Sequence, residues 1–155
     1  GPELVFLDEL TQGLDPQSRR ATWSLIREIR DHGTTVVLVT HFMDEAEHLC
    51  DRLAVVDAGR VVAIDTPQGL IDGLGLPSVV RFSTSAPDLG WLEDLEVVTS
   101  IARRDDAVDV LGTGPVLALV ASALVAHEIV PTDLRVERPT VEDAFLTLTG
   151  KALRE

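Results

Sequence analysis

Hydrophobic residues follow two alternating spacings along the first half of the chain. A short apolar run at residues 4–7 is typical of a buried strand, and the acids Asp8 and Glu9 follow it directly. Apolar residues then recur at helical spacing within 16–33, and a second apolar run follows at 34–40. This order predicts parallel strands of an open α/β sheet, whose carboxyl ends are where ligands bind.

The first helix has clear start and stop signals in the sequence. Asp15 is a favourable N-cap, Pro16 suits the first helical position and Gly33 suits the residue beyond the end. Helical spacing predicts that one apolar face turns toward the core, made of Ala21, Leu25, Ile26 and Ile29.

The rest of the chain divides at a glycine- and proline-containing stretch, residues 73–78, which predicts a linker. Before it we expect a helix at 43–50, a hairpin of strands 52–57 and 60–65 turning at Ala58-Gly59, and a helix at 67–73. After it we expect strand 79–83, a weak helix at 87–95, strands 97–103 and 107–112, helix 115–127 and strand 132–137. This second order, βαββαβ, is typical of a ferredoxin-like split βαβ unit.

A last helix is predicted from Thr140, which opens a capping box, to Gly150. Its apolar positions, and hence its docking face, are Val141, Ala144, Phe145 and Leu148. The fold class is therefore α/β, with one domain at residues 1–74 and a small α+β accessory domain at 75–155 that carries this helix.

Composition narrows the possible partners. The net charge of -13 argues against binding to nucleic acid or to an anionic lipid surface, both of which need clustered Lys and Arg. The one cysteine, Cys50, excludes an intrachain disulfide framework and is best explained as a small apolar residue on a helix. No stretch reaches the roughly 20 apolar residues that span a bilayer.

Three motifs occur in a characteristic order. Val5 to Glu9 ends a strand in two acids, Gly13-Leu14-Asp15 opens the next helix, and His41 follows the next strand. Separately, each has an ordinary explanation, because acids at a strand end often cap a helix and a lone histidine carries little information. Together they resemble the C-terminal half of an ATP-binding cassette (ABC) ATPase, as the Walker B segment, the D-loop and the switch histidine.

The resemblance implies a role for each of these side chains. Asp8 would hold Mg²⁺, largely through water, and Glu9 would be the general base that orients the attacking water. His41 would contact the γ-phosphate and the base, and Asp15 would take part in nucleotide binding across a dimer of ATPase subunits. Leu10 departs from the family pattern, which usually has proline there, so the turn that holds Glu9 is less constrained.

The chain has no G-x-x-x-x-G-K-[ST] phosphate loop and no Leu-Ser-Gly-Gly-Gln signature. We therefore expect a fragment that begins just before Walker B: a partial P-loop NTPase parallel sheet without its Walker A half, then the ferredoxin-like domain. Such a fragment should neither bind nor hydrolyse ATP by itself. Its open sheet edges should lead to self-association or to poor order within 34–65.

The segments 57–67 and 139–146 resemble ATPase subunits of daunorubicin-resistance-type multidrug exporters. This resemblance implies that the parent protein couples Mg-ATP hydrolysis to drug or antibiotic efflux. Its partners would be a separate membrane permease, a second ATPase subunit and the missing N-terminal half, with no nucleic acid. It would lie in the cytoplasm, peripheral to the inner face of the cell membrane. For the accessory domain, a regulatory or ligand-binding module and a dimerisation or docking module both stay open.

The other polar residues have simpler interpretations. His32 and His127 lie without metal-ligand partners at suitable spacing, so we expect surface or helix-end positions. For the acidic run at 44–48 a solvated helix face is a better interpretation than a metal site with His41. Arg103 to Asp106 is most simply a charged hairpin tip.

Overall fold

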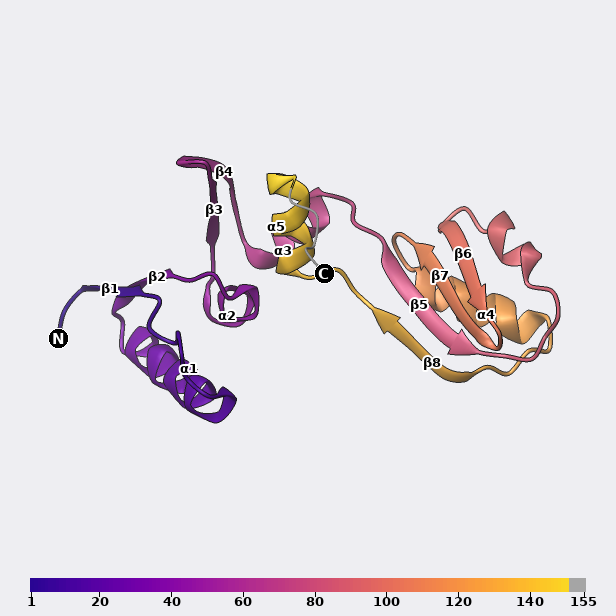
Figure 1. Ribbon diagram of the computed structural model, residues 1–155, viewed down its shortest axis with the longest axis horizontal. Coiled ribbons are helices and arrows are strands. Elements are labelled where there is room, and N and C mark those ends of the chain that lie inside the picture. The colour runs from indigo at the N-terminus through magenta and orange to yellow at the C-terminus, as the bar shows by residue number, and fades with distance from the viewer. Residues whose placement is uncertain (151–155) are drawn as a thin grey trace. The chain divides into compact units, whose positions relative to one another are not determined.

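The computed structural model describes residues 1–150 and divides the chain into two compact units (Figure 1). Unit 1 comprises Gly1–Leu74 together with the segment that begins at Thr140, and unit 2 comprises Gly75–Pro139. The described residues form a mixed α/β structure with small sheets and five α-helices. The boundary near residue 74 agrees with the sequence, but the last helix does not join the accessory domain as expected.

Unit 1 opens with the predicted strand, helix and strand. Strand β1 (Leu4–Asp8) pairs in parallel with β2 (Thr35–Val39), and helix α1 (Pro16–Asp31) connects them. The Asp15 carboxylate caps α1, accepting hydrogen bonds from the backbone N–H groups of Gln17 and Ser18 at 2.9 and 3.0 Å. The parallel pairing places the residues after both strands at one edge.

The second part of unit 1 contains the predicted hairpin between helices. Its elements are α2 (Met43–Leu49), the antiparallel strands β3 (Leu53–Asp57) and β4 (Arg60–Asp65), and α3 (Pro67–Gly73). Ala58 and Gly59 both have positive φ, 47° and 76°, as a two-residue hairpin turn of matching twist requires.

Helix α5 (Val141–Thr149) belongs to unit 1 because of its packing. It contacts α2, α3 and β4, and its Val141 and Ala144 side chains are buried. The capping box at Thr140 is present as predicted, and the Val141 N–H also donates to Glu47 Oε2 at 3.2 Å. The prediction that this helix docks on a core is confirmed. The prediction that it belongs to a domain at residues 75–155 is wrong, because it packs in unit 1. Its core partner lies 70 or more positions earlier in the chain, so local patterns could not identify it.

Large apolar side chains remain exposed in unit 1. Alternate residues of β1 and β2 face outward, with Phe6 69% and Val39 52% exposed. Further exposed positions lie on α1 and the β3–β4 hairpin: Leu25, Val56, Val61, Val62 and Ile64. The expected apolar face of α1 is therefore only partly correct, because Ile26 is buried while Ala21 and Leu25 are exposed. Self-association of the chain stays a prediction.

Unit 2 has four antiparallel strands with one α-helix. Its elements are β5 (Ser78–Ser83), η1 (Gly90–Asp94), β6 (Val98–Arg104), β7 (Ala107–Gly112), α4 (Val116–Ala126) and β8 (Thr132–Glu137). The strand order is β6-β7-β5-β8, so each crossover passes over one intervening strand, as in a split βαβ arrangement. Strands β5 and β7 and helix α4 supply the core, including Val80, Val110, Val120 and Leu124.

The helix expected at 87–95 is only a five-residue 3₁₀ turn, η1. The Arg103 guanidinium donates to the carbonyl oxygens of Thr84, Ala86 and Pro87, which ties the start of this segment to β6. Asp88 also accepts from the Gly90 N–H at 2.9 Å, a local bond that competes with helix. Arg103 thus organises this segment and is more than part of a charged hairpin tip.

Candidate functional site

Glu9 and His41 meet where β1 and β2 end. His41 Nδ1 lies 3.1 Å from Glu9 Oε1. The two side chains are 52% and 43% exposed, so the pair faces solvent. An exposed contact of this kind contributes little to stability. Its importance is geometric, because it leaves one oxygen of the carboxylate and the second ring nitrogen free for other partners.

The backbone at Glu9 is in the left-handed region. Its φ is 45°, which costs a residue other than glycine about 1–3 kcal/mol. Two hydrogen bonds hold it, from the Glu9 N–H to the Val39 carbonyl at 2.8 Å and from the Gln12 N–H to the Glu9 carbonyl at 3.0 Å. The turn is therefore fixed by the neighbouring strand even though Leu10 stands where a proline would constrain it.

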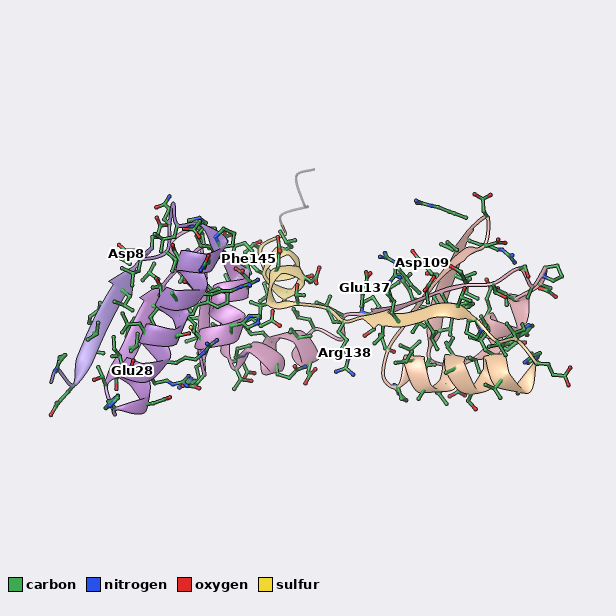
Figure 2. The ribbon with its side chains drawn as sticks, turned by 90° about the horizontal axis from the view of Figure 1, so that it is seen from below. Asp8, Glu28, Asp109, Glu137, Arg138 and Phe145 are labelled. Atoms are coloured by element: carbon green, nitrogen blue, oxygen red, sulfur yellow. The ribbon has the colours of Figure 1, made fainter. Side chains whose placement is uncertain are left out.

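Asp8 is the last residue of β1 and is exposed (Figure 2). By alternation along the strand it shares the outward face of Leu4 and Phe6, while Glu9 lies in the turn beyond. A single exposed carboxylate suits Mg²⁺, which keeps several waters and takes its remaining ligands from substrate phosphates. Within residues 1–150 no group of three or more His, Cys, Asp or Glu could hold a metal by protein ligands alone.

Asp15 is set apart from the Glu9–His41 pair. Its carboxylate caps α1, and the Ser18 hydroxyl also donates to it. The Ser18 hydroxyl and backbone N–H hold the pKa of Asp15 below its ordinary value. Across the described part of the chain, no hydrogen bond or ion pair joins Asp8 or Asp15 to Glu9 or His41. The structure therefore joins Glu9 and His41 by a direct contact, with Asp8 next to Glu9 in the chain and Asp15 engaged as the cap of α1.

Glu45 is the residue that the sequence analysis missed. The expected solvated face at 44–48 is wrong at this position, because Glu45 is fully buried and its Oε1 accepts a 2.9 Å hydrogen bond from Trp23 Nε1. A tryptophan on a core-facing helix needs an acceptor for its indole N–H, which was the available signal. The neighbouring Cys50 is half-buried, and burial raises the pKa of its thiol, with smaller contributions from Asp51 and Glu45. An unreactive structural cysteine fits this environment.

Comparison with known proteins identifies the class. No family model matches the chain. The linearmycin resistance ATP-binding protein of Bacillus subtilis (strain 168) is 33% identical over 99% of the chain and 52% of its own length. A daunorubicin resistance ATP-binding protein of Streptomyces coeruleorubidus is 38% identical over 96% of the chain and 48% of its own length. The Nod factor export ATP-binding protein I of Neorhizobium galegae is 36% identical over 99% of the chain and 43% of its own length.

The chain is thus homologous to ABC ATP-binding proteins. In particular, it matches the C-terminal part of a group that includes daunorubicin resistance ATPases, and the family recognised from the motifs is confirmed. The chain spans about half the length of the curated relatives it matches. Among the described residues, no helix has both the length and the apolar character needed to cross a membrane.

Proposed function

We propose that this chain is the C-terminal part of an ABC-type subunit that hydrolyses Mg-ATP. The observation that carries the proposal is the Glu9–His41 contact of 3.1 Å at the carboxyl ends of two adjacent parallel strands. These strands would form part of the parallel P-loop NTPase sheet, whose phosphate loop comes from sequence outside this chain. Ligands of such sheets bind at this edge.

In this mechanism Glu9 acts as the general base. One carboxylate oxygen contacts His41, and the other is free to accept a proton from the attacking water. A loose phosphoryl-transfer transition state depends mainly on positioning and on charge stabilisation, so a carboxylate is a strong enough base. The left-handed backbone at Glu9 aims this carboxylate beyond the end of the strand.

His41 would link the base to the terminal phosphate. When both ring nitrogens carry protons, Nδ1–H donates to Glu9 and Nε2–H can donate to a phosphate oxygen. Asp8 would hold Mg²⁺ through water, and the metal would neutralise charge on the β- and γ-phosphates. Asp15 would contribute to the nucleotide site across a dimer of ATPase subunits, at the start of α1.

The decisive experiment measures Mg-ATP hydrolysis by the complete subunit. Wild-type protein should hydrolyse ATP, and a Glu9→Gln variant should bind ATP while losing most of its turnover. The chain of 155 residues alone should show no binding of Mg-ATP in a calorimetric titration. Micromolar affinity of the isolated chain would contradict the proposal that the phosphate cradle lies elsewhere.

We further propose that the complete subunit drives export of a drug or antibiotic through a separate membrane permease. The support comes from the names of its relatives, which include ATP-binding proteins of linearmycin resistance, daunorubicin resistance and Nod factor export. The subunit would lie in the cytoplasm, peripheral to the inner face of the membrane. Co-purification with a permease, lost when the permease gene is deleted from the host, tests this arrangement.

Unit 2 has two candidate functions. A docking or dimerisation module is favoured by α4, which exposes Leu119 and Val125 by 41% and 71%. The alternative is a regulatory or ligand-binding module. Excising residues 75–139 from the complete subunit separates the two. Loss of assembly supports docking, whereas intact assembly with an altered ATPase rate supports regulation.

A further inference from the structure

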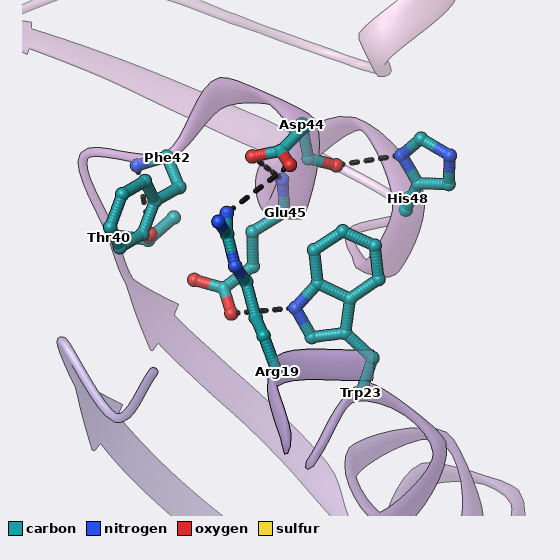
Figure 3. Close-up of polar contacts among 7 residues, drawn as sticks. All are labelled: Arg19, Trp23, Thr40, Phe42, Asp44, Glu45 and His48. Carbon is teal, nitrogen blue, oxygen red and sulfur yellow. Dashed lines mark hydrogen bonds and ion pairs between the residues drawn. The ribbon is translucent and has the colours of Figure 1, made fainter. Parts of the chain in front are cut away.

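A buried carboxylate joins α1 to the segment that follows β2 (Figure 3). Glu45 has no exposed surface, and Trp23 donates to its Oε1. Its Oε2 is one of two buried side-chain oxygens without a hydrogen-bond partner in the described part of the chain, the other being Thr11 Oγ1. Burying a carboxylate with half of its bonding capacity unused is costly. Packing alone therefore does not explain why a carboxylate is buried at position 45.

Helix α2, which carries Glu45, has little to fix its own start. It is seven residues long, and its N-cap, Phe42, makes no side-chain capping bond. Isolated helices of this length are unstable in water, so the placement of α2 depends on tertiary contacts. Helix α1 supplies two part-buried polar contacts to α2: the Trp23–Glu45 hydrogen bond near its start and a 3.4 Å bond from Arg30 to the Leu49 carbonyl at its end.

A second contact from α1 reaches the same segment one turn earlier. The Arg19 guanidinium lies 4.6 Å from the centre of the Phe42 ring, and its Nη1 is 3.3 Å from Asp44 Oδ2. The Phe42 ring in turn lies 4.3 Å from the His41 ring, centre to centre. Arg19 therefore touches the residue that packs directly on the imidazole.

These contacts form two branches. One runs from Arg19 on α1 through the Phe42 ring to His41, whose Nδ1 meets Glu9. The other runs from Trp23 on α1 to Glu45, which is joined to Phe42 through the backbone of residues 42–45. Figure 3 shows Arg19 and Trp23 both reaching from α1 toward α2. The Thr40 hydroxyl, which accepts from the Phe42 N–H at 3.0 Å, is the local bond that shapes the segment between the strand and the helix.

We propose that Glu45 and Arg19 are positioning residues that hold the His41 imidazole against Glu9 by fastening residues 40–45 to α1. The catalytic consequence rests on the proposed function, but the geometric effect does not require nucleotide. The two contacts are unequal. The Arg19–Asp44 ion pair is open to solvent, with side chains 24% and 55% exposed, so Arg19 acts chiefly through the Phe42 ring.

The test uses the 155-residue chain, labelled with ¹⁵N and carrying Phe6→Thr to limit self-association, and follows the two ring nitrogens of His41 by NMR. A His41→Gln variant assigns these signals among the four histidines. Trp23→Phe removes the indole donor and retains an aromatic ring against His48, whereas Trp91→Phe makes the same change in unit 2, where Trp91 stacks on His127. We expect the His41 signals to shift and broaden only in Trp23→Phe.

A second pair of variants keeps the proposal testable if Trp23→Phe fails to fold. Arg19→Met removes the cation from the Phe42 ring, and Arg20→Met is the matched change at the exposed neighbour on the same helix. Arg19→Met should shift the His41 signals, whereas Arg20→Met and Asp44→Asn should leave them nearly unchanged. Glu45→Gln keeps an oxygen that accepts from Trp23 and should preserve the wild-type signals, whereas Glu45→Leu should not.

One control tests for coupling to Glu9 in particular. In a Glu9→Ala background His41 has lost its carboxylate partner, so Trp23→Phe should no longer change the imidazole signals. Unchanged His41 signals in both Trp23→Phe and Arg19→Met, with the methyl signals of buried Ile26 intact, would overturn the proposal. Failure of the complete subunit to hydrolyse ATP, with this coupling present, would overturn only the proposed function.

Discussion

The His41 imidazole and the Glu9 carboxylate lie 3.1 Å apart although 32 positions separate them in the chain. The contact exists because β1 and β2 are adjacent and parallel, which brings their carboxyl ends to one edge. Under the proposed function, this contact would pair the general base with the imidazole at the edge of the sheet where ATP binds. Preorganisation of this kind is the main resource of an enzyme that transfers phosphoryl groups.

Replacing Glu9, the proposed general base, should lower turnover selectively. In the complete subunit, we expect Glu9→Gln to lower the ATP hydrolysis rate by about 10²–10⁴-fold, because a glutamine side chain cannot accept the proton from water. The affinity for ATP, measured by equilibrium binding, should fall little. Glu3→Gln is the matched control, since Glu3 is exposed just before the same strand and should retain wild-type turnover. Equal turnover in both variants would contradict the role of Glu9.

The exposed face of β1 should make the isolated chain self-associate. Phe6 is 69% exposed on a two-stranded sheet with open edges. The weight-average mass of the wild-type chain, measured by light scattering, should therefore rise with concentration, and it should rise less in Phe6→Thr. Val130→Thr alters an 88% exposed residue in unit 2 and should leave association unchanged. A monodisperse wild-type monomer, with native-like exchange protection throughout residues 34–65, would refute both self-association and poor order there.

The start of α5 should matter for the stability of unit 1. Thr140→Ala removes the hydroxyl that caps this helix, and we expect it to lower the free energy of unfolding by about 1 kcal/mol. Urea denaturation followed by circular dichroism measures the change. Thr147→Ala, an exposed mid-helix substitution, should change stability by only a few tenths of a kcal/mol, about the difference in helix propensity. Equal effects of the two variants would count against the cap.

Acid should weaken the first turn of α1 through Asp15. Its pKa is lowered in the folded chain, chiefly by the Ser18 hydroxyl, so its carboxylate stabilises the fold above the unfolded pKa of about 3.9. That stabilisation is lost as the pH falls through the lowered pKa that Asp15 has in the folded chain. Asp15→Asn keeps a capping side chain without the titration. Denaturation curves between pH 6 and 2 should therefore show a smaller acid dependence in the variant, and parallel curves would contradict the prediction.

Local sequence patterns predicted most elements, because capping and periodicity are local properties. Asp15 and Thr140 each marked a helix start correctly, and the Ala58-Gly59 turn was found from its residues alone. The family resemblance implied the Glu9–His41 contact, and the adjacent parallel strands β1 and β2 bring the two residues to one edge.

The failures involve partners that are distant in sequence. Glu45 was predicted to be solvated because the residues near it in sequence do not indicate its hydrogen-bond partner, Trp23, which lies 22 positions away. The segment 87–95 forms only the 3₁₀ turn η1, and the bond from Arg103 to the Ala86 carbonyl, which comes from a residue 17 positions away, could not be read from local periodicity. Leu25 follows the periodicity of a core residue yet is exposed, because a helical pattern does not say whether a partner is present to cover it.

The return of α5 to unit 1 makes unit 2 an insertion with two covalent junctions, near residues 74 and 139. A protease that cuts at one junction leaves the halves tied together by the other, so release of unit 2 requires two cleavages. A stop codon after residue 74 likewise strips unit 1 of the helix that buries Val141 and Ala144 against it. Truncations in this region therefore report on the folding of unit 1 as well as on the absence of unit 2.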